Sequence, residues 1–147
     1  MEYPMSYSAN KLKRKTDSSS NPIDSTVAAC VSELMNAATS FHKLHLKVKG
    51  AGSFAAHKAL NEIYDALPGH ADTIAEAYQG ASEKLLDYKE VAPKVLTSVE
   101  DALSYLRDMH EMISGLQAKM PYSEIVNELD NIKSDINSVK YKLIFLK

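Results

Sequence analysis

Four long stretches of the chain place apolar residues at alternating steps of three and four, and none alternates apolar and polar residues as a strand would. Such steps bring the apolar positions onto one face of an α-helix. The four faces are Val27, Val31, Leu34, Ala38, Phe41, His45 and Val48; Ala56, Leu60, Ile63, Leu67, Ala71, Ile74 and Tyr78; Val99, Leu103, Leu106, His110, Ile113 and Met120; and Tyr122, Ile125, Leu129, Ile132, Ile136, Val139, Leu143 and Leu146. The pattern predicts an all-α protein.

Local signals set the expected helix ends. Lys49-Gly50-Ala51-Gly52 ends the first helix, and Ser53 is expected to cap the second. Pro68-Gly69 lies inside the second helix and predicts a kink or a split there. Thr97-Ser98-Val99-Glu100 fits a capping box for the third helix, and Pro121 separates it from the fourth.

The connection between the second and third helices is long, whereas the other two are short. Residues 80–95 carry a small apolar cluster, Leu85, Leu86 and Tyr88, for which we expect a short helix. One long crossover that runs the length of a bundle is typical of the ferritin-like topology. The expected fold is therefore a ferritin-like four-helix bundle with a long crossover carrying a short helix.

Composition adds boundaries to this picture. The 147 residues fit one domain, and residues 1–22 are polar and serine-rich, so we expect a tail before a bundle at 23–147. No apolar run resembles a signal peptide or a membrane span, and Cys30 is the single cysteine, which predicts a cytoplasmic protein without disulfides. The tail carries four basic residues, Lys11, Lys13, Arg14 and Lys15.

Polar residues of the second helix share one face. His57, Asn61, Asp65, Asp72 and Glu76 fall within about a quarter of the helix circumference. Imidazole nitrogens and carboxylate oxygens are ligands that suit iron or another divalent metal, and His45 on the first helix is a further candidate. The alternatives are that His45 is a core residue and that the acids are a solvated face. No Glu-x-x-His occurs, which argues against a di-iron centre inside one bundle.

The spacing of these residues resembles the Dps miniferritins. His45 in His45-Leu46-Lys47-Val48-Lys49-Gly50 is followed at offsets of 12, 16, 27 and 31 by His57, Asn61, Asp72 and Glu76. The resemblance implies an iron site between two subunits, with both histidines from one chain and Asp72 and Glu76 from its neighbour. It further implies a dodecamer that oxidises Fe(II) and stores iron, and a basic tail that binds DNA.

The match departs from the family at informative positions. Asn61 stands where the family has a bridging aspartate, and an amide brings no negative charge to offset Fe(III). Asp65, one turn further on, is the better placed carboxylate. Leu46 replaces a tryptophan, and Ala77 replaces an arginine that often follows the acidic pair. We therefore expect iron binding with at most weak ferroxidase activity.

Shorter segments resemble a group of small ferritin-like proteins carried by tailed phages: His57–Leu60, Glu76–Gly80, Asn131–Lys133 and Lys140-Tyr141. Three hypotheses follow. The first is that the chain is an iron-binding homo-oligomer in the cytoplasm. The second is that it is a structural or assembly component of a phage virion, which contacts other virion proteins and has a degenerate metal site or none. The third is that it binds DNA through Lys11, Lys13, Arg14 and Lys15, for which a merely solubilising tail is the alternative.

Overall fold

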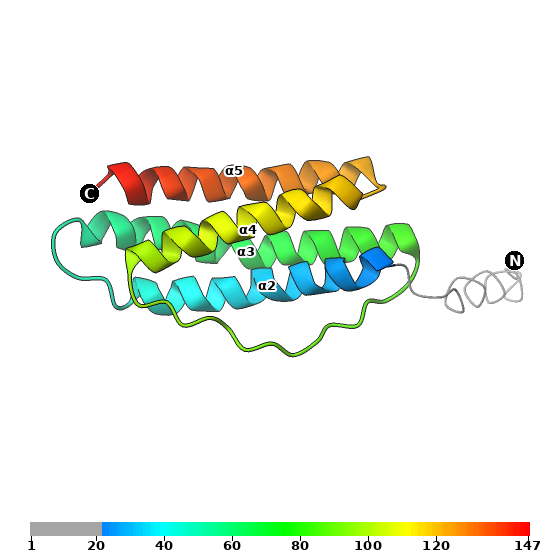
Figure 1. Ribbon diagram of the computed structural model, residues 1–147, viewed down its shortest axis with the longest axis horizontal. Helices are drawn as coiled ribbons and strands as arrows, with labels where there is room; N and C mark the ends of the chain where they lie inside the picture. Colours follow the sequence, from blue (N-terminus) through cyan, green and yellow to red (C-terminus); the bar gives the residue numbers. More distant parts are fainter. Residues whose placement is uncertain (1–21) are drawn as a thin grey trace, which may run out of the picture.

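The computed structural model describes residues 22–147, and these form four helices without a strand. They are α2 (Pro22–His45), α3 (Ser53–Ser82), α4 (Val99–Lys119) and α5 (Ser123–Phe145). Helix α2 packs against α3 and α4, and α5 packs against the same two helices, so the four form a closed bundle (Figure 1). The expected four-helix bundle is confirmed. None of the four helices is long and apolar enough to cross a membrane.

The apolar faces predicted from the spacing form the core. On α3 all seven predicted positions are buried, and so are the six predicted positions on α2, whereas Val48, in the turn after α2, is partly buried. On α5 the six positions from Ile125 to Leu143 are buried, whereas Leu146 stays 45% exposed beyond the helix end. His45 is buried with its apolar neighbours, at 7% exposure. Steps of three and four therefore identified the inward faces of α2, α3 and α5. On α4 the prediction was only partly right, because Val99, Leu103 and His110 are half-buried while the unpredicted Ala102, Tyr105, Met109 and Leu116 are buried.

Two glycines shape the turn between α2 and α3. Gly50 and Gly52 have φ angles of 90° and 80°, which side chains with a Cβ rarely adopt. Gly52, not Ser53, is the N-cap of α3, and Ser53 is the first helical residue. A Cβ on Gly52 would also lie only 3.2 Å from the Cα of Lys147. The turn thus brings the start of α3 against the end of the described chain.

Helix α3 continues through Pro68 without a break, so the expected split does not occur. Pro68 and Gly69 are exposed. The carbonyl that loses its N–H partner to the proline therefore faces solvent, where water can bind it. The helix tolerates the proline because the lost hydrogen bond lies on its outer side.

The long crossover runs along the bundle from the end of α3 to the start of α4 (Figure 1). The short helix expected at Leu85–Tyr88 is absent: residues 83–98 contain no helix. Leu85 is 87% exposed, and the Leu86 N–H donates to the Gln79 Oε1 at 2.9 Å instead of to a helical carbonyl. A side-chain acceptor has replaced the helical hydrogen bond.

The length that the crossover must cover explains its extended form. It joins α3 and α4 with 16 residues. As a helix they would reach about 24 Å, short of the roughly 32 Å length of α4, whereas extended chain reaches up to about 50 Å. Helix α2 supports the extended path, since Asn36 Nδ2 donates to the Val91 carbonyl at 2.7 Å and Ser40 Oγ donates to the Lys94 carbonyl at 2.6 Å.

Candidate functional site

The imidazoles of His45 and His57 stack on one another where α2 ends and α3 begins. Their ring centroids are 4.1 Å apart and their planes differ by 23°. His45 Nδ1 lies 3.0 Å from the His42 carbonyl oxygen, and His57 Nδ1 lies 2.9 Å from the His45 carbonyl oxygen. A carbonyl oxygen only accepts hydrogen bonds, so each Nδ1 must carry the proton. In the neutral rings, Nε2 then keeps a lone pair that is available to a metal ion.

Two further rings extend this stack. His42 and Tyr64 are nearly parallel, with centroids 3.9 Å apart and planes that differ by 4°. The Tyr64 ring also lies 4.9 Å from that of His45. We call His42, His45, His57 and Tyr64 the aromatic cluster. The sequence-based prediction missed Tyr64, although its position seven residues after His57 places both on one helix face.

Asn61 and Asp65 join the aromatic cluster through Tyr64. The Tyr64 hydroxyl donates to Asn61 Oδ1 at 2.6 Å, and Asn61 Nδ2 donates to Asp65 Oδ2 at 2.7 Å. The amide oxygen, the atom through which an asparagine would bind a cation, is therefore already an acceptor. The structure brings four of the predicted site residues, His45, His57, Asn61 and Asp65, to one region of α2 and α3.

The other two predicted residues lie elsewhere on the same chain. Asp72 and Glu76 are exposed on the second half of α3. Asp72 is 15 residues beyond His57, a separation of about 22 Å along a helix axis. Within residues 22–147 no group of three or more His, Cys, Asp or Glu side chains could hold a metal ion. The predicted tail residues Lys11, Lys13, Arg14 and Lys15 lie outside the described residues.

Other polar groups pair inside the bundle and offer no site. The Tyr105 hydroxyl donates to Glu33, and burial together with this carboxylate raises the pKa of the tyrosine. Burial, and to a lesser extent Glu33, raises the pKa of Cys30 to about 12, which leaves an unreactive thiol. Near the start of α2, Asp24 accepts from Tyr78 at 2.5 Å and pairs with Lys84 at 2.8 Å. These pairs satisfy buried polar atoms.

The fold has a counterpart among known structures. A crystal structure of ferritin from the multicellular green alga Ulva pertusa superposes with a TM-score of 0.65. The match covers 99% of this chain and 89% of the alga's ferritin chain. The sequences are 16% identical, so the likeness concerns the fold. The expected ferritin-like fold is confirmed.

Sequence comparison finds relatives nearer in sequence. An uncharacterised 14.6 kDa protein from the mobD–ri intergenic region of Enterobacteria phage T4 is 30% identical over 115 residues, which are 77% of this chain and 80% of the phage protein. The family described as "Family of unknown function (DUF5856)" matches residues 45–143, a segment that contains both stacked histidines and the acidic pair. The chain therefore belongs to the DUF5856 family and has a relative encoded by a phage.

Proposed function

We propose that this protein is a Dps-like iron-binding oligomer whose metal site forms between two copies of the chain. The observation that carries the proposal is the pair of stacked imidazoles, His45 and His57. Both hold Nδ1 in hydrogen bonds to backbone carbonyls, which is how metal-binding histidines are commonly oriented. Both therefore direct only Nε2 to a ligand.

The missing carboxylates would come from a second copy. Asp72 and Glu76 are exposed and one turn apart on α3, so both can reach across an interface. A two-fold interface brings each surface against its equivalent, which generates two identical sites. In each site His45 and His57 of one copy would face Asp72 and Glu76 of the other. Nitrogen and carboxylate ligands suit Fe(II), and other divalent metals as well.

Iron is the substrate or the stored cargo in this proposal. Asp65 lies two turns beyond His57 and accepts from the Asn61 amide, while Asn61 contributes no charge and has its oxygen bonded to Tyr64. The loss of a negative ligand weakens the binding of Fe(III) more than that of Fe(II), because the Coulomb attraction grows with the charge of the cation. We therefore propose iron sequestration as the main activity, with slow oxidation of Fe(II) by oxygen or peroxide.

The first test measures Fe(II) binding by His57→Ala with calorimetry under anaerobic conditions. The substitution removes one of the two imidazoles, and we expect Fe(II) affinity to fall by at least about ten-fold with helicity unchanged. The control is His110→Ala on α4, which removes a half-buried histidine outside the aromatic cluster. Equal Fe(II) binding by His57→Ala and the parent would refute the site.

The phage T4 relative favours a second function, that of a structural or assembly component of a phage particle. The two functions predict different assemblies. An iron-storing shell of twelve 16.2-kDa chains would have a mass of about 194 kDa, whereas a packing module would be a monomer, dimer or ring. Light scattering on the purified protein distinguishes them. A small oligomer that does not bind Fe(II) would favour the structural function.

A further inference from the structure

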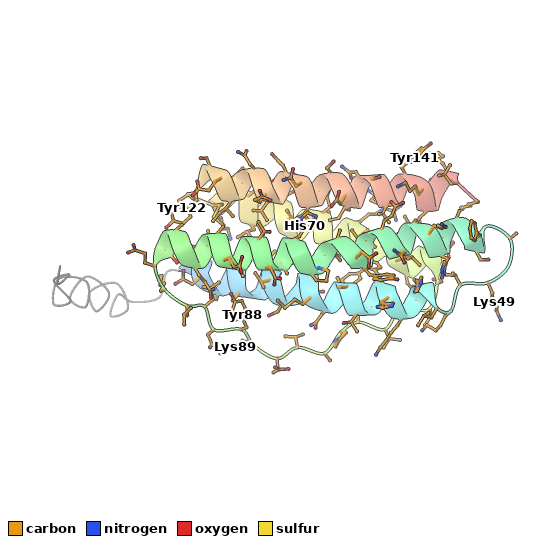
Figure 2. All side chains as sticks on the ribbon, turned by 180° about the vertical axis from the view of Figure 1, so that it is seen from behind. Lys49, His70, Tyr88, Lys89, Tyr122 and Tyr141 are labelled. Atoms are coloured by element: carbon orange, nitrogen blue, oxygen red, sulfur yellow. The ribbon has the colours of Figure 1, made fainter. Side chains whose placement is uncertain are left out.

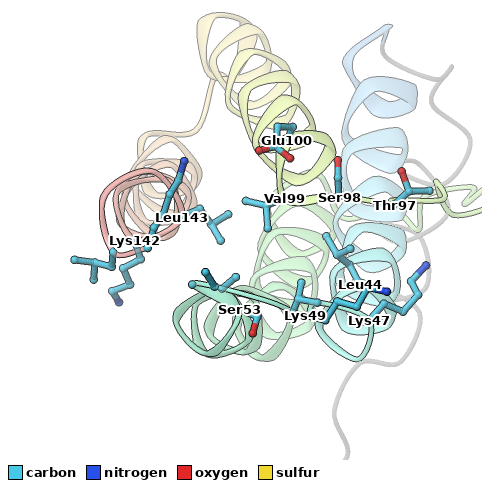
Figure 3. Close-up of a pocket in the computed structure, with 16 residues that line it drawn as sticks. Leu44, Lys47, Lys49, Ser53, Thr97, Ser98, Val99, Glu100, Lys142 and Leu143 are labelled. Atoms are coloured by element: carbon cyan, nitrogen blue, oxygen red, sulfur yellow. The ribbon is translucent and has the colours of Figure 1, made fainter.

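A cavity of about 370 Å³ opens at the end of the bundle where the α2–α3 turn, the start of α4 and the end of α5 meet (Figure 3). Figure 2 shows Lys49 and Tyr141 at this end and Tyr122 at the other. None of the predicted metal ligands lines the cavity. It is therefore a feature separate from the aromatic cluster.

The floor of the cavity is apolar. Leu44, Ala56 and Leu143 line it and belong to the buried core, with exposures of 1%, 7% and 2%. Val99, the first residue of α4, adds a further aliphatic wall. Figure 3 shows Val99 and Leu143 on neighbouring helices beside the opening. An apolar group that entered the cavity would contact the same side chains that hold the four helices together.

The rim is cationic. Lys47, Lys49, Lys142 and Lys147 line the cavity, against one acidic side chain, Glu100. Lys142 pairs with Glu62, and Lys47 Nζ donates to the Leu96 carbonyl at 3.2 Å. Lys49 and Lys147 make no hydrogen bond or ion pair with any residue from 22 to 147. Two ammonium groups at the opening are thus available to an anion.

We propose that this cavity binds an amphiphilic anion, an alkyl chain of about ten carbons that ends in a carboxylate or phosphate. At about 30 Å³ for each water-sized group, the volume holds roughly a dozen non-hydrogen atoms. The chain would cover the apolar floor, and the anionic end would meet Lys49 and Lys147. An inorganic anion would leave the floor in contact with water, and a neutral hydrocarbon would leave the ammonium groups unused.

The test uses decanoate at monomeric concentrations with the full chain, by calorimetry and by amide chemical shifts of Gly52, Ser53 and Val99. We expect one saturable site, and affinity that falls about three- to four-fold for each methylene removed from the ligand. The double variant Lys49→Gln/Lys147→Gln should weaken binding by about ten-fold. The matched control is Lys58→Gln/Lys140→Gln, which removes two charges from α3 and α5 outside the cavity lining.

A variant that fills the cavity provides an independent readout. Ala56→Leu places three more carbons at the apolar floor and should abolish decanoate binding while the circular dichroism of the bundle is retained. If Ala56→Leu does not fold, the lysine variants and the ligands of different chain length still test whether the cavity binds decanoate. Equal affinity for decanoate and acetate, or an equal loss of decanoate binding in both lysine pairs, would overturn the proposal.

The source of the alkyl anion is a separate arm of the test. Vesicles of phosphatidylglycerol present the same chemistry at a lipid surface. Co-sedimentation that is lost in Lys49→Gln/Lys147→Gln would identify a membrane lipid as the ligand. Decanoate binding without co-sedimentation would identify a free amphiphile. Both outcomes support the cavity as an amphiphile site, and failure of both ligands contradicts it.

Discussion

A buried histidine costs free energy unless its ring nitrogens find partners, and His45 meets this condition in the turn that ends α2. Its Nδ1 bonds the His42 carbonyl, one of the last carbonyls of the helix, which lack intrahelical donors. The ring face is covered by His57 at 4.1 Å. Burial of His45 therefore satisfies a helix end and leaves Nε2 as the ring's open position. A structural role and a ligand role use different atoms of the same side chain.

Asn61 is the residue at which a single substitution should strengthen the proposed site. Asn61→Asp adds a negative charge beside the aromatic cluster, and a charge about 4 Å from a cation contributes roughly 1–4 kcal/mol between bulk-water and surface screening. We expect Fe(II) affinity to rise by about ten-fold or more and oxidation to accelerate, measured anaerobically and then with peroxide. Asn137→Asp, exposed on α5, is the charge-matched control. No change in Asn61→Asp would place Asn61 away from the bound metal.

Tyr105 links stability to alkaline pH. Burial and its bond to Glu33 raise the pKa of Tyr105 in the folded protein above the value of about 10 in unfolded chains. Its contribution is therefore complete below about pH 10 and declines as pH rises, because the unfolded chain then releases a proton that the folded protein retains. Tyr105→Phe should lower the free energy of unfolding by about 1–3 kcal/mol at pH 7, since Glu33 loses its donor.

The same variant should show a flatter pH dependence. Between pH 10 and 11.5, the free energy of unfolding of the parent, measured by urea titration, should fall more steeply than that of Tyr105→Phe, by up to about 1.4 kcal/mol per pH unit. Tyr141→Phe, 54% exposed on α5, is the control for the loss of a hydroxyl. Parallel pH profiles for the parent and Tyr105→Phe would show that Tyr105 is not the group that links stability to alkaline pH. The Glu33–Tyr105 pair was invisible in the sequence, because its members are 72 residues apart.

At the scale of the elements, the start of α4 shows how a local motif can be displaced by one residue. The predicted capping box began at Thr97, but the N-cap is Ser98, whose Oγ accepts from the Asp101 N–H at 3.1 Å. Asp101 Oδ2 in turn accepts from the Thr97 Oγ1 and N–H at 2.7 and 2.8 Å. Asp101 therefore takes the role expected of Glu100.

These bonds make the cap sensitive to acid. The side-chain and backbone bonds from Thr97 lower the pKa of Asp101. The stabilisation is present above the unfolded pKa of about 3.9 and is lost as pH falls through the lower folded value. Asp101→Asn should reduce the melting temperature at pH 7 and have a smaller effect at pH 2.5. Thermal unfolding monitored by circular dichroism measures both. Asp108→Asn, exposed on the same helix, is the control, and an equal loss at both pH values would exclude the ionised carboxylate as the cause.

The helices and the presence of one long crossover were predictable, whereas the path of the crossover was not, for a physical reason. Burial of one helix face imposes a period on the sequence, and that period located α2 to α5 to within a few residues. The path of residues 83–98 is instead set by the distance to be covered and by donors on another helix, Asn36 and Ser40. No local period records such constraints. The apolar cluster at Leu85–Tyr88 therefore gave a wrong prediction of a short helix.

At the scale of the whole molecule, one chain contains the components of the proposed site but not the complete site. The resemblance to the Dps miniferritins predicted His45 and His57 as a pair, and the structure brings their rings together. The same helix that carries His57 separates it from Asp72 by about 22 Å, so the acids and the imidazoles cannot meet within one bundle. In the proposed site they meet between two copies, across a two-fold interface.

Mixing two defective chains tests this directly. Neither His57→Ala nor Asp72→Ala/Glu76→Ala should bind Fe(II) tightly alone. In a mixed two-fold pair, one site combines both defects, while the other combines intact histidines from the acid variant with intact acids from the histidine variant. Refolding the two together should therefore restore about a quarter of the parent's sites after random exchange. Anaerobic Fe(II) titration measures the recovery, and light scattering checks that the chains have assembled. A site within one chain would recover nothing, so binding restored by mixing requires ligands from two copies.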